Sequence, residues 1–355
     1  MYDTISSFIT AFIISFFAIP SIIKIAIEKN LCDEPGERRS HTQATPSLGG
    51  IGIFAGLIFS ITFWIPFDTC DNPEYKYIKY ILCAYIIIFL IGAKDDIIPL
   101  SPFKKFIGQL LAVVILVYHA KIQLSSLYGI LGFHDIPEWL SIVLSVFIFI
   151  VIINAFNLID GINGLAATIG VITCAAFGYW FYVYGRLDLA VLSSATIGAL
   201  MAFLYYNITP AKIFMGDTGS LLIGLTASIL AISFIENNKN WHEHWHIVSV
   251  PAVAVGVLIV PLFDTLRVFI LRAMRKKSPF NADRQHVHHL LLDLGFTHIQ
   301  STVILGLTNI CFIILAYLLK NLGSMVVIVL LFSLAAGLSG MLFYLVCRKK
   351  KAMGA

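Results

Sequence analysis

Charged residues are scarce in this sequence. Only 12% of its 355 residues are Asp, Glu, Lys or Arg, whereas 59% are hydrophobic. Soluble domains average about 25% charged and roughly 45–50% apolar residues. A large soluble core is therefore excluded, and the composition predicts a polytopic membrane protein. The net charge of +4 is small and forms no basic stripe of the kind that binds nucleic acid, so no nucleic-acid partner is expected.

Cysteine patterns and export signals are also missing. The six cysteines are scattered, mostly inside apolar runs, and show no CxxC spacing. We interpret them as small core residues rather than as metal ligands or disulfide partners. The first apolar run has no basic segment before it and no small-residue cleavage site after it. This favours a retained first helix over a signal peptide.

Apolar runs fill most of the chain. A helix needs about 20 mainly apolar residues to cross a bilayer. The sequence predicts an all-α, polytopic integral membrane protein with about 10–11 transmembrane helices, in which residues 1–355 form a single transmembrane domain. The candidate spans are approximately 4–27, 48–66, 77–93, 104–119, 138–153, 166–184, 189–206, 218–235, 247–270, 301–319 and 325–346.

The ninth span contains helix-breaking residues and charges. Pro251, Gly256 and Pro261 predict that this helix bends or breaks. Asp264 and Arg267 follow at i, i+3 spacing. We interpret them as an internal ion pair with a mainly structural role, at the rim of any nearby site.

Lysine and arginine are distributed unevenly between the two sides of the membrane. With eleven spans, one side carries 16 of the 24 basic residues, and the opposite loops carry six. Short basic loops stay in the cytoplasm, so the N-terminus is predicted outside and the C-terminus in the cytoplasm. The opposite loops, such as 237–245, are interpreted as solvated connectors. The predicted cytoplasmic loops cover about 28–47, 94–103, 154–165, 207–217 and 271–300.

Polar residues gather at the end of the fifth span. Asn154, Asn157 and Asp160 follow an apolar run at three-residue spacing, so a helical extension places them on one face. Polar side chains at membrane depth are costly unless they face a site. Gly161 and Gly164 allow a ligand or a neighbouring helix to approach the backbone. Helix packing explains the glycines but not the three polar residues, so this segment favours a functional site.

Two adjacent carboxylates, Asp95 and Asp96, lie at another membrane boundary. They repel each other, and Mg²⁺ would stabilise both, since it takes one or two carboxylates together with water and phosphate oxygens. A carboxylate with a raised pKa that acts as a base is an alternative, and a solvated turn is the plainer interpretation. Lys105 and Gln109 are spaced i, i+4, so both can face the same site.

Two further loops precede helices. The segment Thr45–Gly50 follows basic residues and contains a Pro and a Gly pair, which suits an anion site at a helix start. A simpler interpretation is that the basic residues only keep this loop in the cytoplasm, and that the Pro and Gly residues only form a turn. Asp217 follows Phe214 by three positions. Asp217 suits the role of a metal ligand or that of an N-cap. An exposed Phe214 would be available to stack on a flat base.

Three histidines, His286, His288 and His289, lie within four positions of the loop 271–300. Zinc sites usually add Cys or carboxylate ligands at separated spacings. Because Arg284 precedes the histidines in a basic loop, phosphate binding and proton handling are favoured over zinc. A solvated loop is the remaining alternative.

Taken in order, these motifs resemble the polyprenyl-phosphate N-acetylhexosamine-1-phosphate transferase superfamily, glycosyltransferase family 4. The matching set is Thr45-Pro46-Ser47-Leu48-Gly49-Gly50, Asp95-Asp96, Asn154-x-x-Asn157-x-x-Asp160-Gly161, Phe214-Met215-Gly216-Asp217 and Arg284-x-His286-x-His288-His289. The spacing of these histidines is similar to that in the WecA/TagO-like undecaprenyl-phosphate N-acetylglucosamine-1-phosphate transferases. The sister translocase that uses UDP-MurNAc-pentapeptide carries three consecutive histidines, and an Asp where this chain has Asn163. Both differences weigh against that substrate.

The resemblance implies an enzyme. It would transfer N-acetylhexosamine-1-phosphate, with N-acetylglucosamine favoured, from a UDP-sugar to undecaprenyl phosphate and release UMP. This reaction is the first membrane step of cell-envelope polysaccharide synthesis, such as that of O-antigen or teichoic acid. The implied cofactor is Mg²⁺, with Mn²⁺ as a substitute, and the implied partners are UDP-N-acetylhexosamine, undecaprenyl phosphate, the lipid bilayer and a second copy in a homodimer. The location is the bacterial inner (cytoplasmic) membrane, with the site on the cytoplasmic face.

Two alternatives remain at this stage. One is the pentapeptide translocase-type activity. The other is a membrane transporter, because intramembrane Asn and Asp also mark ion pathways. A transporter should place polar groups at the midplane between inverted repeats, whereas here they cluster at one face and no repeat is evident.

The resemblance also implies roles for individual residues. Catalysis is assigned to Asp95, Asp96, Asp217 and His288, and metal binding to Asp217, Asp95 and Asp96. Nucleotide binding is assigned to Asn157, Asp160, Gly161 and Phe214. Phosphate and sugar binding is assigned to Asn154, Asn163, Arg284, His286, His288 and His289, and lipid-phosphate binding to Lys105. A direct, single-step displacement is favoured, and a covalent route through Asp95 or Asp96 stays open.

Overall fold

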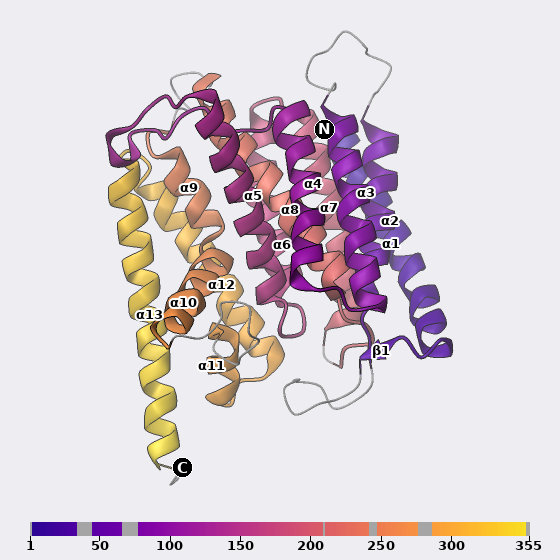
Figure 1. Cartoon of the computed structure of the whole chain (residues 1–355). Coiled ribbons are helices and arrows are strands. Elements are labelled where there is room, and N and C mark those ends of the chain that lie inside the picture. Colours follow the sequence, from indigo (N-terminus) through magenta and orange to yellow (C-terminus); the bar gives the residue numbers. More distant parts are fainter. Residues whose placement is uncertain are drawn as a thin grey trace.

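The computed structural model describes residues 2–33, 45–65, 77–208, 210–240, 247–275 and 286–352, and most of them are helical (Figure 1). The first helices are α1 (Tyr2–Glu28), α2 (Gly49–Trp64), α3 (Ile78–Ile97), α4 (Pro102–Val114), α5 (Glu138–Ile159), α6 (Leu165–Val183) and α7 (Leu187–Asn207). The others are α8 (Gly216–Asn237), α9 (Val250–Val257), α10 (Ile259–Met274), α11 (Val287–Asp293), α12 (His298–Leu318) and α13 (Ser324–Ala352). The short elements are the antiparallel pair β1 (Cys32–Asp33) and β2 (Thr45–Pro46), a π-helical turn Ile115–His119, and 3₁₀ turns Ile130–Gly132 and Asn238–Asn240.

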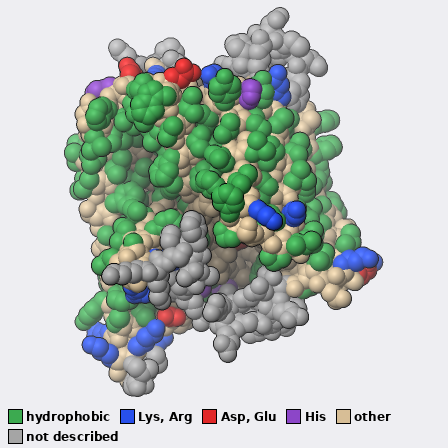
Figure 2. Space-filling model, in the orientation of Figure 1, with side chains coloured by type: hydrophobic (Ala, Val, Ile, Leu, Met, Phe, Trp, Pro, Cys, Tyr) green, Lys and Arg blue, Asp and Glu red, His purple; other side chains and the backbone are tan. Residues whose placement is uncertain are grey.

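The all-α polytopic fold is confirmed. Among the described residues, eight helices are long and apolar enough to cross a membrane, and the bent pair α9–α10 makes a ninth. All eleven predicted spans coincide with helices, but α2 has only 16 residues and α3 carries four charged residues. Hydrophobic side chains cover the middle of the face drawn in Figure 2, and charged side chains gather mainly towards its two ends.

Helix α8 forms the centre of the bundle. Its apolar stretch is entirely buried, and it packs against α2, α3, α5, α6, α7 and α9. Small residues let neighbouring backbones approach closely, and the hydroxyls of Thr226 and Ser228 donate to the carbonyls four residues earlier. The first turn of α8, which carries Asp217, therefore lies where several helix ends meet.

The ninth predicted span is broken, as Pro251, Gly256 and Pro261 predicted. Helices α9 and α10 meet at an angle of 81°. Pro261 has no N–H to donate to the carbonyl of Val257. The buried Asn309 of α12 donates its Nδ2 to that carbonyl instead, at 3.1 Å. The break lets α10 pack against α5.

The end of the bundle that contains the α6–α7 connection is held by polar side chains. Arg186 forms a bidentate pair with the buried Asp188 and donates to Asn237 at 2.6 Å. Asn238 is buried, and its amide bonds to the backbone of Ile247 in both directions. The interpretation of loop 237–245 as a solvated connector was therefore wrong for its first residues, Asn237 and Asn238, because their side chains hold helix ends together.

The two chain termini lie at opposite ends of the bundle, and α13 extends beyond the end that carries α11 and β1 (Figure 1). The polar motifs predicted for the cytoplasm are at the α11 end, as their contacts below show. The assignment of this end to the cytoplasm stays a prediction.

Candidate functional site

The described parts of the five predicted loops meet at one end of the bundle. The Phe214 N–H donates to the Pro46 carbonyl at 2.7 Å. The Gly164 N–H donates to Asn207 Oδ1 at 2.6 Å. Asp96 accepts a hydrogen bond from the first turn of α8. Four loops are thus linked directly, and α11 joins them where His288 lies against Gly161. Arg284 lies outside the described residues.

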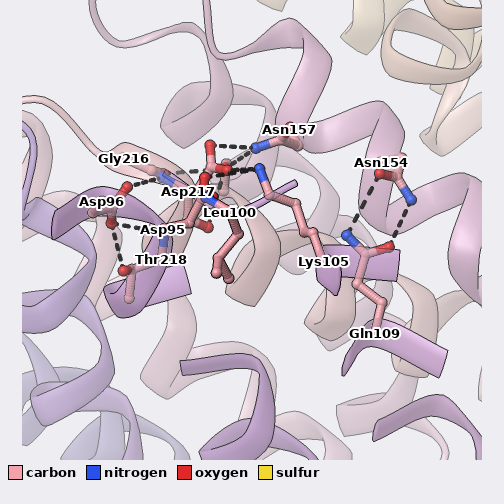
Figure 3. Close-up of polar contacts among 11 residues, drawn as sticks. Asp95, Asp96, Leu100, Lys105, Gln109, Asn154, Asn157, Gly216, Asp217 and Thr218 are labelled. Carbon is pink, nitrogen blue, oxygen red and sulfur yellow. Dashed lines mark hydrogen bonds and ion pairs between the residues drawn. The ribbon is translucent and has the colours of Figure 1, made fainter. Parts of the chain in front are cut away.

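The centre of the site is a lysine between two carboxylates (Figure 3). Lys105 of α4 forms ion pairs with Asp95 of α3, at 2.9 Å, and with Asp217 of α8. Asp95 also accepts a hydrogen bond from the Leu100 N–H at 2.6 Å. Asn157 of α5 donates its Nδ2 to Asp217 Oδ1 at 2.9 Å. Four helices thus bring together four residues that sequence reasoning selected.

Asp96 has different surroundings from Asp95. Its two oxygens accept hydrogen bonds from the backbone N–H groups of Asp217 and Thr218, at 2.7 and 3.0 Å, and from the Thr218 hydroxyl. The first N–H groups of a helix have no partner within it, and no side chain of α8's own N-cap residue satisfies them. Asp96 therefore caps α8 from a different helix. Its predicted metal role stays a prediction.

Gly216 makes this cap possible. Its φ of +70° lies in the left-handed region, which L-residues with a side chain rarely adopt. A Cβ there would lie 2.2 Å from the Ser47 carbonyl oxygen and 2.6 Å from Asp96 Oδ2. Glycine is therefore required where α8 begins.

Asn154 does not face the carboxylates. Its Nδ2 donates to Gln109 Oε1 at 2.8 Å and to the Ile150 carbonyl, and Gln109 is buried (Figure 3). The pair joins α5 to α4. The expectation that Lys105 and Gln109 face the same site is correct for the lysine and wrong for the glutamine, because its side chain turns to α5.

Asn207 was missed by the sequence analysis. It is buried, accepts from Gly164, and donates its Nδ2 to the Ile213 carbonyl at 2.8 Å. It therefore holds the loop after α5 to the loop before α8. Its only sequence signal is a polar amide at the end of an apolar span. Asn163 lies on the same loop, and its backbone bonds to His298 and Thr302.

Asp160 and Gly161 follow the last turn of α5. Desolvation, followed by the negative charges of Asp217 and Asp96, raises the pKa of the Asp160 carboxyl to about 7. A Cβ on Gly161 would lie 2.3 Å from His288 Nε2. The close approach expected at this glycine is thus made by an imidazole.

His288 is 1% exposed, and neither of its ring nitrogens has a hydrogen-bond partner among the described residues. Burial, followed by the charge of the neighbouring His289, lowers its pKa to about 3, so it is neutral at physiological pH. It borders, with Asp264, an apolar cavity of about 210 Å³ between α10, α12 and α13. Its predicted role with phosphate stays a prediction.

His286 is oriented by Asp264 of α10. The carboxylate lies 2.8 Å from His286 Nδ1 and accepts from the Val287 N–H at 2.9 Å. Arg267 lies 3.9 Å from the same carboxylate, so the predicted ion pair is present. Asp264 therefore does more than pair internally, because it anchors the start of α11. His289 packs against His288 with the two rings tilted and their centres 4.3 Å apart.

The glycine pair at the start of α2 packs internally. The N–H groups of Gly49 and Gly50 donate to the carbonyls of Phe214 and Met215, each at 2.9 Å. These donors are satisfied within the protein, which supports the simpler interpretation of this loop. Phe214 is half-buried rather than exposed, and its backbone is hydrogen-bonded to Pro46 and Gly49. Its predicted nucleotide contact stays a prediction.

The donor set bears on the implied metal. Among the described residues, no group of three or more His, Cys, Asp and Glu side chains could hold a metal ion. The two carboxylates gathered by Lys105 are nevertheless hard oxygen donors, and Mg²⁺ needs only one or two when substrate phosphates complete its ligands. Asp95 and Asp217 therefore fit Mg²⁺ bound together with a diphosphate.

Comparison with known proteins decides the family. A profile described as Glycosyl transferase family 4 matches residues 78–235. Over 318 residues the chain is 32% identical to the probable undecaprenyl-phosphate N-acetylglucosaminyl 1-phosphate transferase of Bacillus subtilis (strain 168), covering 88% of this chain and 85% of that protein. The chain belongs to glycosyl transferase family 4.

Other members of the family agree. The undecaprenyl-phosphate alpha-N-acetylglucosaminyl 1-phosphate transferases of Salmonella typhi and Escherichia coli (strain K12) are 32% and 31% identical. Each alignment covers 86% of this chain, and 81% and 80% of the relatives, respectively. The family profile extends from α3 to α8, and so includes Asp95, Lys105, Asn157 and Asp217.

Proposed function

We propose that this protein transfers N-acetylglucosamine-1-phosphate from UDP-N-acetylglucosamine to undecaprenyl phosphate and releases UMP. The observation that carries the proposal is the group Asp95–Lys105–Asp217 at one end of an apolar bundle. The names of the relatives support the sugar and the lipid acceptor. They favour this donor over UDP-MurNAc-pentapeptide, in agreement with the spacing of the three histidines and with Asn, rather than Asp, at position 163.

In the proposed reaction, an oxygen of the lipid phosphate attacks the β-phosphorus of the UDP-sugar. A new phosphorus–oxygen bond forms, the bond to the UMP oxygen breaks, and UMP leaves. Several negative charges approach one another, so preorganised positive charge should stabilise the transition state most. Mg²⁺ held by Asp217 and Asp95, with Mn²⁺ as a substitute, would neutralise diphosphate charge.

The chain's own residues supply position and charge. Lys105 reaches both carboxylates, so its ammonium is available to a phosphate oxygen that replaces one of them. Asn157 holds one oxygen of Asp217, which leaves the other oriented towards the lysine. Asp264 holds Nδ1 of His286, which fixes the direction of the imidazole. Direct displacement is favoured, and the ion pair of Asp95 with Lys105 supports it, since this carboxylate is engaged before substrate binds.

We also propose that the site faces the cytoplasm of a bacterial inner membrane. The excess of lysine and arginine in the loops at this end supports the orientation, and the soluble nucleotide donor is made in that compartment. The lipid acceptor would reach the same end from within the bilayer. A homodimer stays a prediction.

The decisive test follows UMP release by the purified protein with undecaprenyl phosphate and a panel of UDP-sugars. Turnover is expected with UDP-N-acetylglucosamine and Mg²⁺, and EDTA should abolish it. Absence of UMP with every sugar would overturn the proposed function.

Asp217→Asn separates the metal assignment from the fold. It should lower UMP release by about 100-fold or more, because a transition-state interaction is lost, while the melting temperature in detergent stays close to that of the wild type. Asp293→Asn, at an exposed carboxylate of α11, is the control and should retain activity. Full activity in Asp217→Asn would remove the metal assignment and leave the reaction class intact.

A further inference from the structure

A second cleft lies between α10, α11 and α13. It has a volume of about 430 Å³ and combines apolar and basic walls. Its apolar wall includes Phe263, Leu271, Leu290, Phe343 and Val346. Its basic residues are Arg267, Arg275 and Lys350. No residue of the Asp95–Lys105–Asp217 group lines it.

Small residues line part of the α13 side of the cleft. Ala336, Ser339 and Gly340 form this wall, and a Cβ on Gly340 would meet no atom within 4 Å. Helix α13 is also the helix that extends furthest beyond the bundle, at the end that carries α11 (Figure 1). An open, apolar channel therefore runs along α13 towards a basic end.

The charges of the cleft are not balanced within it. Among the described residues, three basic side chains and one acidic side chain, that of Asp293, line it. Asp293 pairs with Lys350 at 3.3 Å, where both side chains are about half exposed. Arg267 pairs with Asp264 at 3.9 Å, so it is not counted as available to a ligand. Arg275 is exposed at the end of α10. The cleft therefore suits a negatively charged group attached to an apolar chain.

We propose that this cleft binds an anionic phospholipid. The headgroup phosphate would lie at Arg275 and Lys350, because guanidinium and ammonium groups donate charge-assisted hydrogen bonds to phosphate oxygens. One acyl chain would lie along Phe263, Phe343 and the open surface at Gly340. Basic pockets between membrane helices are recognised sites for anionic headgroups.

The position of the cleft favours a phospholipid over the lipid acceptor of the proposed reaction. Helices α10 and α13 lie at one edge of the bundle, and α5 and α8 separate them from α3 (Figure 1). A bound phospholipid would instead support α11, which contributes Leu290 to the cleft and His288 to the site. The ligand thus has a positioning role beside the reaction.

The test measures lipid binding by the full-length protein in neutral detergent, without any UDP-sugar. Native mass spectrometry and thermal unfolding would compare phosphatidylglycerol with phosphatidylcholine, diacylglycerol, inorganic phosphate and undecaprenyl phosphate. Phosphatidylglycerol alone is expected to remain bound at this cleft and to raise the melting temperature. Because no transfer is measured, failure of the proposed function would not affect this result.

Variants locate the site. Arg275→Gln combined with Lys350→Gln should weaken phosphatidylglycerol binding by about tenfold or more. Gly340→Phe should also weaken it, by filling the channel while every charge is kept. Lys29→Gln, at an exposed lysine at the end of α1, is the matched control and should bind normally.

Three outcomes would overturn the proposal. The first is equal binding by the Arg275→Gln/Lys350→Gln variant and the wild type. The second is equal binding of phosphatidylcholine and phosphatidylglycerol. The third is a cleft occupied by inorganic phosphate or undecaprenyl phosphate in preference to the phospholipid.

Discussion

Two neighbouring carboxylates, Asp95 and Asp96, face different partners. Asp95 meets Lys105, and Asp96 bonds to the first N–H groups of α8. Adjacent residues on a helix point about 100° apart, which explains why the two carboxylates have different partners here. The pattern Asp-Asp predicted a charged site but not this division.

The division predicts opposite effects for two substitutions. Asp96→Ala leaves two N–H groups without an acceptor, and each such buried group costs about 1–3 kcal/mol. The melting temperature should therefore fall clearly. Asp95→Ala removes one backbone acceptor, that of the Leu100 N–H, rather than two, so it should lower the melting temperature less. It should abolish UMP release, because it removes a carboxylate from the Lys105 group. Thermal unfolding in detergent and the UMP assay, applied to both variants, check this. Equal destabilisation by the two changes would contradict it.

His288 predicts a pH dependence of stability. Its pKa is lowered to about 3 in the folded protein, against 6.5 ordinarily. Between these values the unfolded chain binds a proton that the folded chain does not. Stability should therefore fall by about 1.4 kcal/mol for each pH unit below 6.5, until the pH approaches 3. Positive charge on His289, His286 and His298 also lowers the pKa of His288, and the carboxylate of Asp264 opposes this effect.

The measurement is denaturant unfolding in detergent at pH 7.5 and 5.5. His288→Gln should lose about 1 kcal/mol less than the wild type between these two values. An identical loss in both proteins would show that other groups determine the acid sensitivity.

At the scale of elements, the broken helix α9–α10 depends on a residue from another helix. Pro261 leaves the carbonyl of Val257 without its helical donor, and Asn309 supplies one. Proline and glycine are tolerated in membrane helices where neighbouring groups satisfy the freed backbone. The proline pattern predicted the break, but nothing near it in the sequence identified Asn309.

Asn309→Leu should therefore destabilise the protein by about 1–3 kcal/mol, since the Val257 carbonyl is buried without a donor. Thermal unfolding in detergent measures the effect. Leu307→Ala, at an exposed position of the same helix, is the control and should change stability much less. A small effect of Asn309→Leu would mean that another donor reaches the carbonyl.

At the scale of the whole molecule, the two ends of the bundle have different tasks. One end carries the loops of the site, and the other carries a buried ion pair between Arg186 and Asp188. The latter joins the start of α7 to Asn237 at the end of α8. The contacts of Arg186 are therefore expected to stabilise the fold without taking part in the reaction.

Arg186→Met should destabilise the protein by about 3–5 kcal/mol, because Asp188 is left buried and unpaired. The turnover number of the protein that remains folded should not change. Thermal unfolding and the UMP assay, normalised to folded protein, check both statements. A variant with normal stability and reduced turnover would place this end in the reaction.

Local sequence was sufficient for the membrane spans, the break at Pro261 and the positions of the polar motifs. It did not distinguish Asn154, which packs against Gln109, from Asn157, which bonds to Asp217. Both lie on the same predicted helix face. The difference depends on which neighbouring helix each one meets, and a single helix does not contain that information.

The sequence by itself determined an all-α membrane protein with its polar motifs on one side, because apolar length and loop charge dictate how a chain inserts in a bilayer. The tertiary structure alone decided that Lys105 joins Asp95 to Asp217, that Asp96 caps α8, and that His288 lies against Gly161. The physical reason is that these contacts, apart from that of Lys105 with Asp95, join residues more than a hundred positions apart. The rotation and packing of whole helices set such contacts, and local spacing does not.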